Sequence, residues 1–272
     1  MVEAAGITEA PETWAEFREA LKTLTTGDQY GISFEGGSLG DFIYRTYPFV
    51  LKAGGALLSE DWSESLVTTD PWKKAVQLLV DINNDGSNDP EYLASEMAQV
   101  ADKFAENLVA MSVEGLWFPA EVTNRNPDTE VLIWTIPEPE EAYGPFTQGS
   151  LMDLACFSIT SDSNNKQEAW DFITWATNEE NDAPFADINN GLGGLPVCKA
   201  SVNEPAWADY LGGDTYGAES PNVRGWPHYS SLVEITREIL ATNILKLLSG
   251  EFATVDECLE TSDEAINEVL SR

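Results

Sequence analysis

The chain has 272 residues, of which 43% are hydrophobic and 10% aromatic. This composition provides enough apolar material for a packed core and excludes an intrinsically disordered protein. The 47 acidic residues outnumber the 14 lysines and arginines and give a formal net charge of −33 at pH 7, so nucleic acid and anionic membrane surfaces are excluded as partners.

The acidic residues are spread over the whole length of the chain rather than gathered in a tail. Distributed acidity with few lysines suggests adaptation to high salt. At about 1 M ionic strength the Debye length falls to roughly 3 Å, which screens the mutual repulsion. In dilute buffer the same repulsion is expected to destabilise the fold. The alternative is an ordinary acidic protein.

The first predicted elements are two helices with a strand between them. Thr13 and Glu16 have the spacing of a capping box, and the helix that they start stops at Gly27. Residues 30–34 read as a short strand. Residues 40–55 read as a helix with Pro48 as a kink or a start.

The next segments alternate in the same way. Asp70 and Pro71 combine an N-cap with a proline at the first helical position, and a helix is predicted to follow. Another helix is predicted over residues 90–107, followed by an apolar strand over residues 108–111. Gly115 is expected to let the backbone turn sharply, so that Trp117 presents a flat face.

The rest of the chain continues the pattern. Strands are predicted over residues 131–136 and 151–159, and helices over residues 166–177, 229–249 and 254–270. Strands that alternate with helices predict an α/β architecture.

No cofactor or metal is expected. The three cysteines lie far apart and the chain has one histidine, so a zinc site is excluded, and three buried thiols are favoured over a single disulfide. Asp81, Asn83, Asp85 and Gly86 resemble the start of an EF-hand loop, but Tyr92 stands where the bidentate glutamate belongs. A polar helix stop is the favoured interpretation.

The segment FAENLVAMSVEGLW, residues 104–117, resembles the "F..G..AM...G.W" signature of the extracellular solute-binding proteins of ABC importers, the maltose-binding-protein-like group. Asn107 replaces the glycine that usually follows the Phe. Further resemblances occur in the family's order at residues 1–17, 44–55, 158–177, 193–201 and 247–270.

The resemblance implies a type II periplasmic-binding-protein-like α/β fold, with one lobe nearly complete and remnants of the other. Residues 1–150 would form the second lobe, residues 151–215 would return to the first, and residues 216–272 would pack across both. Met1 falls where the family has already entered lobe two. Most of lobe one is therefore expected to be missing, and ligand binding by this polypeptide is expected to be weak.

Sugar recognition needs flat aromatic faces and planar polar groups. The resemblance places Tyr44, Trp117 and Trp226 toward the cleft. Phe146 and Tyr229 are further aromatic candidates. The two arginines among the candidates could hydrogen-bond a hydroxyl or pair with an anionic ligand. The alternative for each ring is a place in the core, which is expected for Trp14, Trp72, Trp170 and Trp175. The ligand-binding candidates are Tyr44, Arg45, Trp117, Phe146, Arg224, Trp226 and Tyr229.

No catalytic residues are predicted. His228 has no Ser or Cys partner in a known motif, and Glu138, Glu140 and Glu141 read as solvated surface.

The preferred function is the substrate-binding component of an ABC importer that closes on a carbohydrate and docks on the permease. The full-length form is expected to be extracellular or lipid-anchored at the cell surface, with signal and anchor outside this chain. Alternatives are a glycoside hydrolase, a sensor binding domain, or a different ligand such as a glycerol-phosphate, polyamine or peptide.

Overall fold

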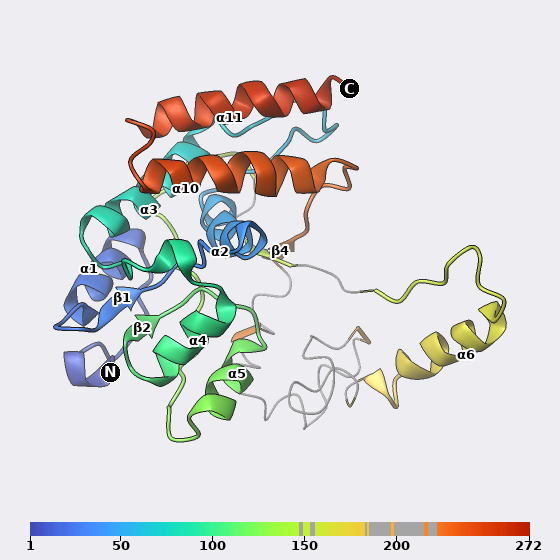
Figure 1. Ribbon diagram of the computed structural model, residues 1–272, viewed down its shortest axis with the longest axis horizontal. Coiled ribbons are helices and arrows are strands. Elements are labelled where there is room, and N and C mark those ends of the chain that lie inside the picture. The colour runs from blue at the N-terminus through green and yellow to red at the C-terminus, as the bar shows by residue number, and fades with distance from the viewer. Residues whose placement is uncertain (147–148, 153–155, 183, 185–196, 199–214, 217–221) are drawn as a thin grey trace. The chain divides into compact units, whose positions relative to one another are not determined.

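The computed structural model describes residues 1–272 except 147–148, 153–155, 183, 185–196, 199–214 and 217–221 (Figure 1). The chain divides into two compact units. Unit 1 comprises Met1–Val113, Thr135–Met152 and Asn222–Arg272, and unit 2 comprises Glu114–Trp134 and Asp153–Pro221. The division predicted from the sequence at residues 150 and 215 stays a prediction.

Unit 1 begins with a short 3₁₀ turn, η1 (Glu3–Ala5), and the helix α1 (Trp14–Leu24). The predicted capping box is confirmed. The Thr13 hydroxyl accepts a hydrogen bond from the Glu16 amide at 3.2 Å, and the Glu16 carboxylate accepts one from the Thr13 amide at 3.2 Å. Both exchanges satisfy amides that the first helical turn leaves without partners.

Two parallel strands follow the predicted positions. β1 (Tyr30–Ile32) pairs with β2 (Val109–Met111), with Tyr30 opposite Val109 and Ile32 opposite Met111. Ile32 and Val109 are fully buried, as expected for a parallel pair covered by helices. Figure 1 shows α1 and α4 beside this pair.

Asn107 ends the helix α4 (Met97–Ala105) in a left-handed conformation, with φ of 62°. Its amide donates to the Phe104 carbonyl, and the Leu108 amide donates to the Lys103 carbonyl. This is the Schellman arrangement, in which glycine or asparagine is favoured at the left-handed position. The substitution of Asn107 for the family's glycine therefore keeps the backbone that leads into β2.

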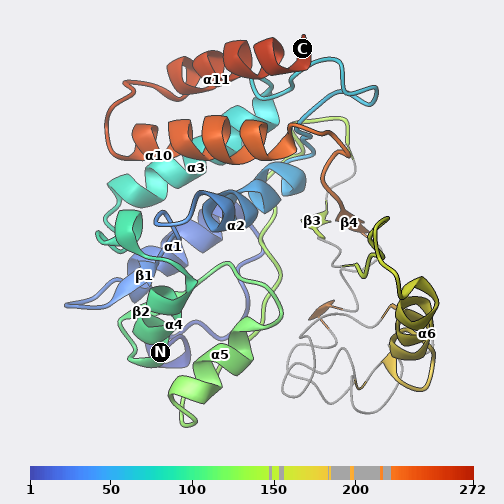
Figure 2. The same ribbon diagram turned by 45° about the vertical axis from the view of Figure 1, so that its right-hand side comes forward.

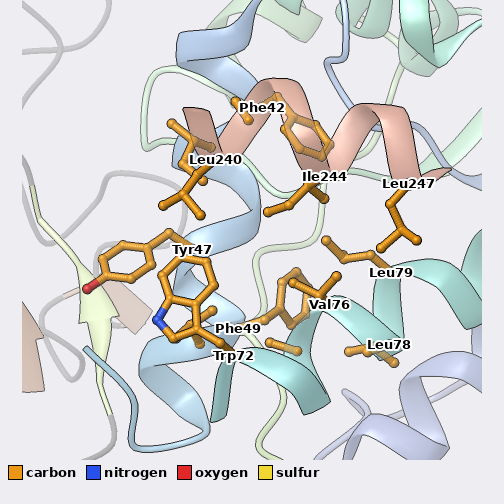
Figure 3. Close-up of a cluster of buried hydrophobic side chains, with 14 of the residues drawn as sticks. Phe42, Tyr47, Phe49, Trp72, Val76, Leu78, Leu79, Leu240, Ile244 and Leu247 are labelled. Carbon is orange, nitrogen blue, oxygen red and sulfur yellow. The ribbon is translucent and has the colours of Figure 1, made fainter. Parts of the chain in front are cut away.

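The core of unit 1 forms between α2 (Leu39–Lys52) and α3 (Asp70–Asn84) and the C-terminal helices. Pro48 lies within α2. Figure 3 shows Phe42, Tyr47 and Phe49 of α2 with Trp72 of α3 and Leu240 and Ile244 from the C-terminal end of the chain. Both helices begin within one residue of the predicted positions.

The C-terminal elements are helical, as predicted. A π-helical stretch, η5 (Glu234–Ala241), continues into α10 (Thr242–Leu248), and α11 (Val255–Leu270) lies beside α10 in both Figure 1 and Figure 2. The π-helical geometry was not predicted. Two short parallel strands, β3 (Ser150–Leu151) and β4 (Val223–Arg224), form a second ladder.

Two predicted elements were wrong in extent, and a third does not form. The helix expected over residues 90–107 begins only at Met97, after a 3₁₀ turn η2 (Tyr92–Ala94), because Glu96 and Gln99 form its capping box. Residues 131–136 form no strand. Of the strand expected over residues 151–159, the described part forms a ladder only at Ser150–Leu151.

Unit 2 contains α5 (Phe118–Arg125) and α6 (Lys166–Ala176). Trp170 and Trp175 of α6 are 58% and 52% exposed, so their expected place in a core was wrong, whereas Trp14 and Trp72 are buried as predicted. The expectation of three buried thiols was also wrong, because Cys156 is exposed and Cys198 half-buried. Among the helices that the structure describes, none has the length and hydropathy to cross a bilayer.

Candidate ligand-binding site

Four aromatic rings of unit 1 form a continuous series, here called the aromatic stack. Trp226 stacks on Tyr47 at 4.4 Å with an interplanar angle of 13°, and Tyr47 stacks on Trp72 at 5.5 Å. Tyr44 meets Trp226 edge-on at 5.5 Å. Tyr44 and Tyr47 share a face of α2 because they lie three residues apart on the helix.

The aromatic stack runs from the core toward the surface. Trp72 and Tyr47 are buried, while Tyr44 and Trp226 are half-buried. Figure 3 shows Tyr47 and Trp72 side by side, and the Trp72 indole donates a hydrogen bond to the Ala56 carbonyl at 2.8 Å. Two fixed inner rings thus hold the two outer rings in place, a condition for a preorganised binding surface.

The electrostatics of the stack differ between its inner and outer ends. Burial raises the pKa of Tyr47 to about 12, and the nearby positive charge of Arg224 opposes that rise. The Trp226 indole nitrogen is buried and has no hydrogen-bond partner among the described residues. An indole N–H is only a donor, and leaving a buried donor unsatisfied costs about 1–3 kcal/mol. A ligand oxygen that accepts from this nitrogen would remove that cost.

Arg224 is placed beside the stack by β4, through the pairing of Leu151 with Arg224. Its Nη1 donates to the Gly55 carbonyl at 2.7 Å, and its guanidinium lies 4.9 Å from the centre of the Phe146 ring. The Phe146 amide donates to the Gly54 carbonyl, so the end of α2 carries both candidates. Gly54 has φ of 77°, which explains a glycine there.

Tyr229 is half-buried and packs against the core cluster, three residues beyond Trp226. Tyr44, Phe146, Arg224, Trp226 and Tyr229 therefore all belong to unit 1 and lie on or next to α2, β4 or the segment after β4.

Arg45 lies in the interior of unit 1. It is 7% exposed, and its Nη2 is 3.1 Å from a carboxylate oxygen of the fully buried Glu35. Although it is a neighbour of Tyr44 in sequence, it points to another side of α2. Direct contact with a solute, expected from its aromatic neighbours in sequence, does not agree with this burial, and a structural ion pair is the revised interpretation.

Trp117 belongs to unit 2, where it precedes α5, and it is 41% exposed. Gly115 does not adopt a positive φ, so the sharp turn expected there is not the reason for the glycine. Its reason is steric: the Trp117 ring occupies the place that a Cβ on residue 115 would need. The glycine therefore lets the indole fold back over the backbone.

Sequence reasoning missed Tyr47 and Trp62 as neighbours of the candidate residues. Tyr47 could have been found from its spacing of three residues after Tyr44. Trp62 meets His228 edge-on at 6.4 Å, and no sequence signal connects two residues so far apart.

In the part of the chain that the structure describes, no group of three or more His, Cys, Asp or Glu side chains could hold a metal ion. In the segment that resembles the start of an EF-hand loop, the carboxylates of Asp81 and Asp85 both form ion pairs with Arg18.

The site combines the faces of the aromatic stack, the Trp226 N–H without a described acceptor and Arg224 bound to a backbone carbonyl. Such a site suits non-covalent binding of a small polar molecule with apolar faces. The fold is that of the type II periplasmic-binding proteins, a class of solute receptors. The family model of the bacterial extracellular solute-binding proteins matches residues 1–212, and the chain belongs to this family.

Solved structures agree with this assignment of the fold. The sugar-binding protein MalE from Xanthomonas citri superposes with a TM-score of 0.79 at 20% identity, over 99% of this chain and 66% of that one. The GacH receptor of Streptomyces glaucescens gives 0.81 at 19% identity, over 99% and 66%. The Thermus thermophilus maltotriose-binding protein gives 0.75 at 19%, over 97% and 68%.

The chain therefore spans about two thirds of the length of these structures. No curated protein matches it significantly in sequence. The family and these structural neighbours are binding proteins rather than enzymes.

Proposed function

We propose that this chain is the substrate-binding component of an ABC importer and that its solute is a sugar or oligosaccharide. The observation that carries the proposal is Trp226, whose ring is fixed on Tyr47 while its buried N–H has no described acceptor. The neighbours in structure support the ligand class, since they include a sugar-binding protein, a maltotriose-binding protein and a receptor solved with acarbose.

In this proposal the outer rings of the aromatic stack contact the C–H face of a pyranose, and the Trp226 N–H donates to a hydroxyl or ring oxygen. Arg224 and Phe146 border the same surface. Trp117, which belongs to unit 2, stays a ligand-binding candidate predicted from the sequence. Binding favours a closed state only as far as the ligand contacts that state better than the open one, and the closed state is the one delivered to the permease.

The proposal includes a location and an environment. The family is extracellular, and we propose a lipid-anchored protein at the cell surface of an organism that lives in high salt. A sensor role would use the same site without transport, and a permease gene next to this one would distinguish import from sensing. A glycoside hydrolase would instead need two carboxylates facing one cleft, and would release reducing sugar.

The Trp226→Ala variant is expected to lose affinity for its sugar by about tenfold or more, because it loses a stacking face and a hydrogen-bond donor that together exceed about 1.4 kcal/mol. Calorimetric titration against monosaccharides and maltodextrins, extended to millimolar concentration, measures the loss. Trp226→Phe keeps a ring without the N–H and should fall between the two.

The matched control is Trp170→Ala, which removes a 58% exposed indole from unit 2. Its affinity should equal that of the unmodified chain. Circular dichroism confirms that each variant is folded. Equal affinity of the folded Trp226→Ala variant and the unmodified chain would contradict the assignment of the site.

A further inference from the structure

Trp62 is an exposed aromatic residue held in an unusual backbone conformation. Its side chain is 38% exposed, and its φ is 59°, in the left-handed region. Bulky residues rarely adopt this region, because the Cβ then crowds the following carbonyl oxygen. A residue kept there at a cost in stability points to a role that the strained position serves.

Hydrogen bonds among the residues before and after Trp62 hold the turn in place. Asp61 accepts hydrogen bonds from the hydroxyls of Ser59 and Ser63 at 2.8 and 2.7 Å, and these bonds, that of Ser63 above all, lower the pKa of Asp61 to about 2. The Ser59 hydroxyl accepts from the amides of Ser63 and Glu64. The Trp62 amide donates to the Ser59 carbonyl. The indole therefore projects from a rigid support rather than from a loose loop.

His228 lies between the candidate site at Trp226 and the ring of Trp62. The two rings meet edge-on at 6.4 Å although they are far apart in sequence, and His228 is also exposed. His228 lies two residues beyond Trp226, so their Cα atoms are at most about 7 Å apart. The exposed pair of Trp62 and His228 thus continues the surface that begins at Trp226, and all three residues belong to unit 1.

We propose that Trp62 and His228 form a second sugar subsite next to Trp226, so that the solute is an oligosaccharide of two or more rings rather than a monosaccharide. The inference rests on the proposed function. Trp62 provides the flat face for a second pyranose, and the imidazole provides a donor and an acceptor for its hydroxyls. A purely structural role for Trp62 would affect stability and leave the preference for ligand length unchanged.

The test compares affinities along a series of glucose, maltose, maltotriose and maltotetraose. The unmodified chain should bind the longer members more tightly than glucose by about 2- to 12-fold, the range that one aromatic contact supplies. Trp62→Gly removes the ring while tolerating the left-handed backbone, and it should abolish this gain without changing the affinity for glucose. Trp62→Phe should retain most of the gain, and Trp170→Ala should retain all of it.

The outcomes separate the two proposals. Loss of affinity at Trp226→Ala together with an unchanged length preference at Trp62→Gly would overturn the second subsite and leave the proposed function in place. An equal loss for every sugar at Trp62→Gly would also overturn it. If the unmodified chain bound no member of the series at millimolar concentration while a non-carbohydrate solute bound and was lost at Trp226→Ala, both proposals would fall.

Discussion

The Arg45→Met variant is expected to unfold at a temperature about 6–20 °C lower than the unmodified chain. The side chains of Arg45 and Glu35 are 8% and 0% exposed, and their charged atoms are 3.1 Å apart. Removing the guanidinium leaves the buried Glu35 carboxylate without this counter-charge, which costs about 3–5 kcal/mol. For a chain of this size each kcal/mol shifts the midpoint by about 2–4 °C. Thermal unfolding followed by circular dichroism measures the shift.

The double variant Glu35→Leu with Arg45→Met provides the matched control. Replacing both members of a buried ion pair by hydrophobic residues of similar volume is often close to neutral, so the double variant should recover most of the lost stability. A shift of less than about 2 °C for Arg45→Met alone, the amount expected for an exposed pair, would contradict the burial of this ion pair.

The same double variant tests the expectation that Arg45 contacts the solute. A folded protein without the guanidinium should keep its affinity for sugar if Arg45 only stabilises unit 1. The change in affinity is therefore independent of the change in stability, and the two measurements assign Arg45 to the ligand or to the core.

Local chemistry made several elements predictable from sequence. The capping box of Thr13 and Glu16 fixes the start of α1 through hydrogen bonds between neighbouring residues. Pro71 favours the start of α3 because its φ is already helical and the first turn needs no N–H from it. The predicted N-cap at Asp70 was wrong, because the N-cap is Thr69 and its side chain makes no capping hydrogen bond. The left-handed position of Asn107 has a cause that is also confined to one residue, although it was not predicted and the helix was expected to continue to residue 107. Such features do not depend on what packs around them.

The features that sequence did not predict depend on tertiary neighbours. Helical spacing shows which residues share a face but not whether another segment covers that face, and so Trp72 is buried while Trp170 is 58% exposed. Arg45 lies one residue from Tyr44, yet the turn of the helix directs it to Glu35 instead of the aromatic stack. The meeting of Trp62 with His228 requires two distant segments, which no local pattern encodes.

Salt is expected to raise the stability of this chain strongly. Lowering KCl from 2 M to 0.1 M should reduce the unfolding midpoint by more than about 10 °C, because the Debye length lengthens from under 3 Å to about 10 Å and exposes 47 acidic groups to one another. Sucrose stabilises through exclusion from the surface and not through screening, so it serves as the uncharged control at 0.1 M KCl. A midpoint that is the same at both salt concentrations would contradict adaptation to high salt.

The helix α11 shows where this repulsion acts and how one substitution can measure it. Its sixteen residues contain six acidic side chains and no lysine or arginine. Glu260, Glu264 and Glu268 are exposed and follow one another at intervals of four, so they repel along one face.

Glu264→Lys turns two repulsive pairs into attractive ones, while Glu264→Gln only removes the repulsion. At 0.1 M KCl we expect the lysine variant to unfold about 2–4 °C higher than the unmodified chain and the glutamine variant about half as much higher. At 2 M KCl all three midpoints should coincide, because neighbouring side chains on a helix are about 5–6 Å apart and screening acts over less than that distance. A gain that persists undiminished at 2 M KCl would show that helix propensity, and not charge repulsion, limits the stability of α11.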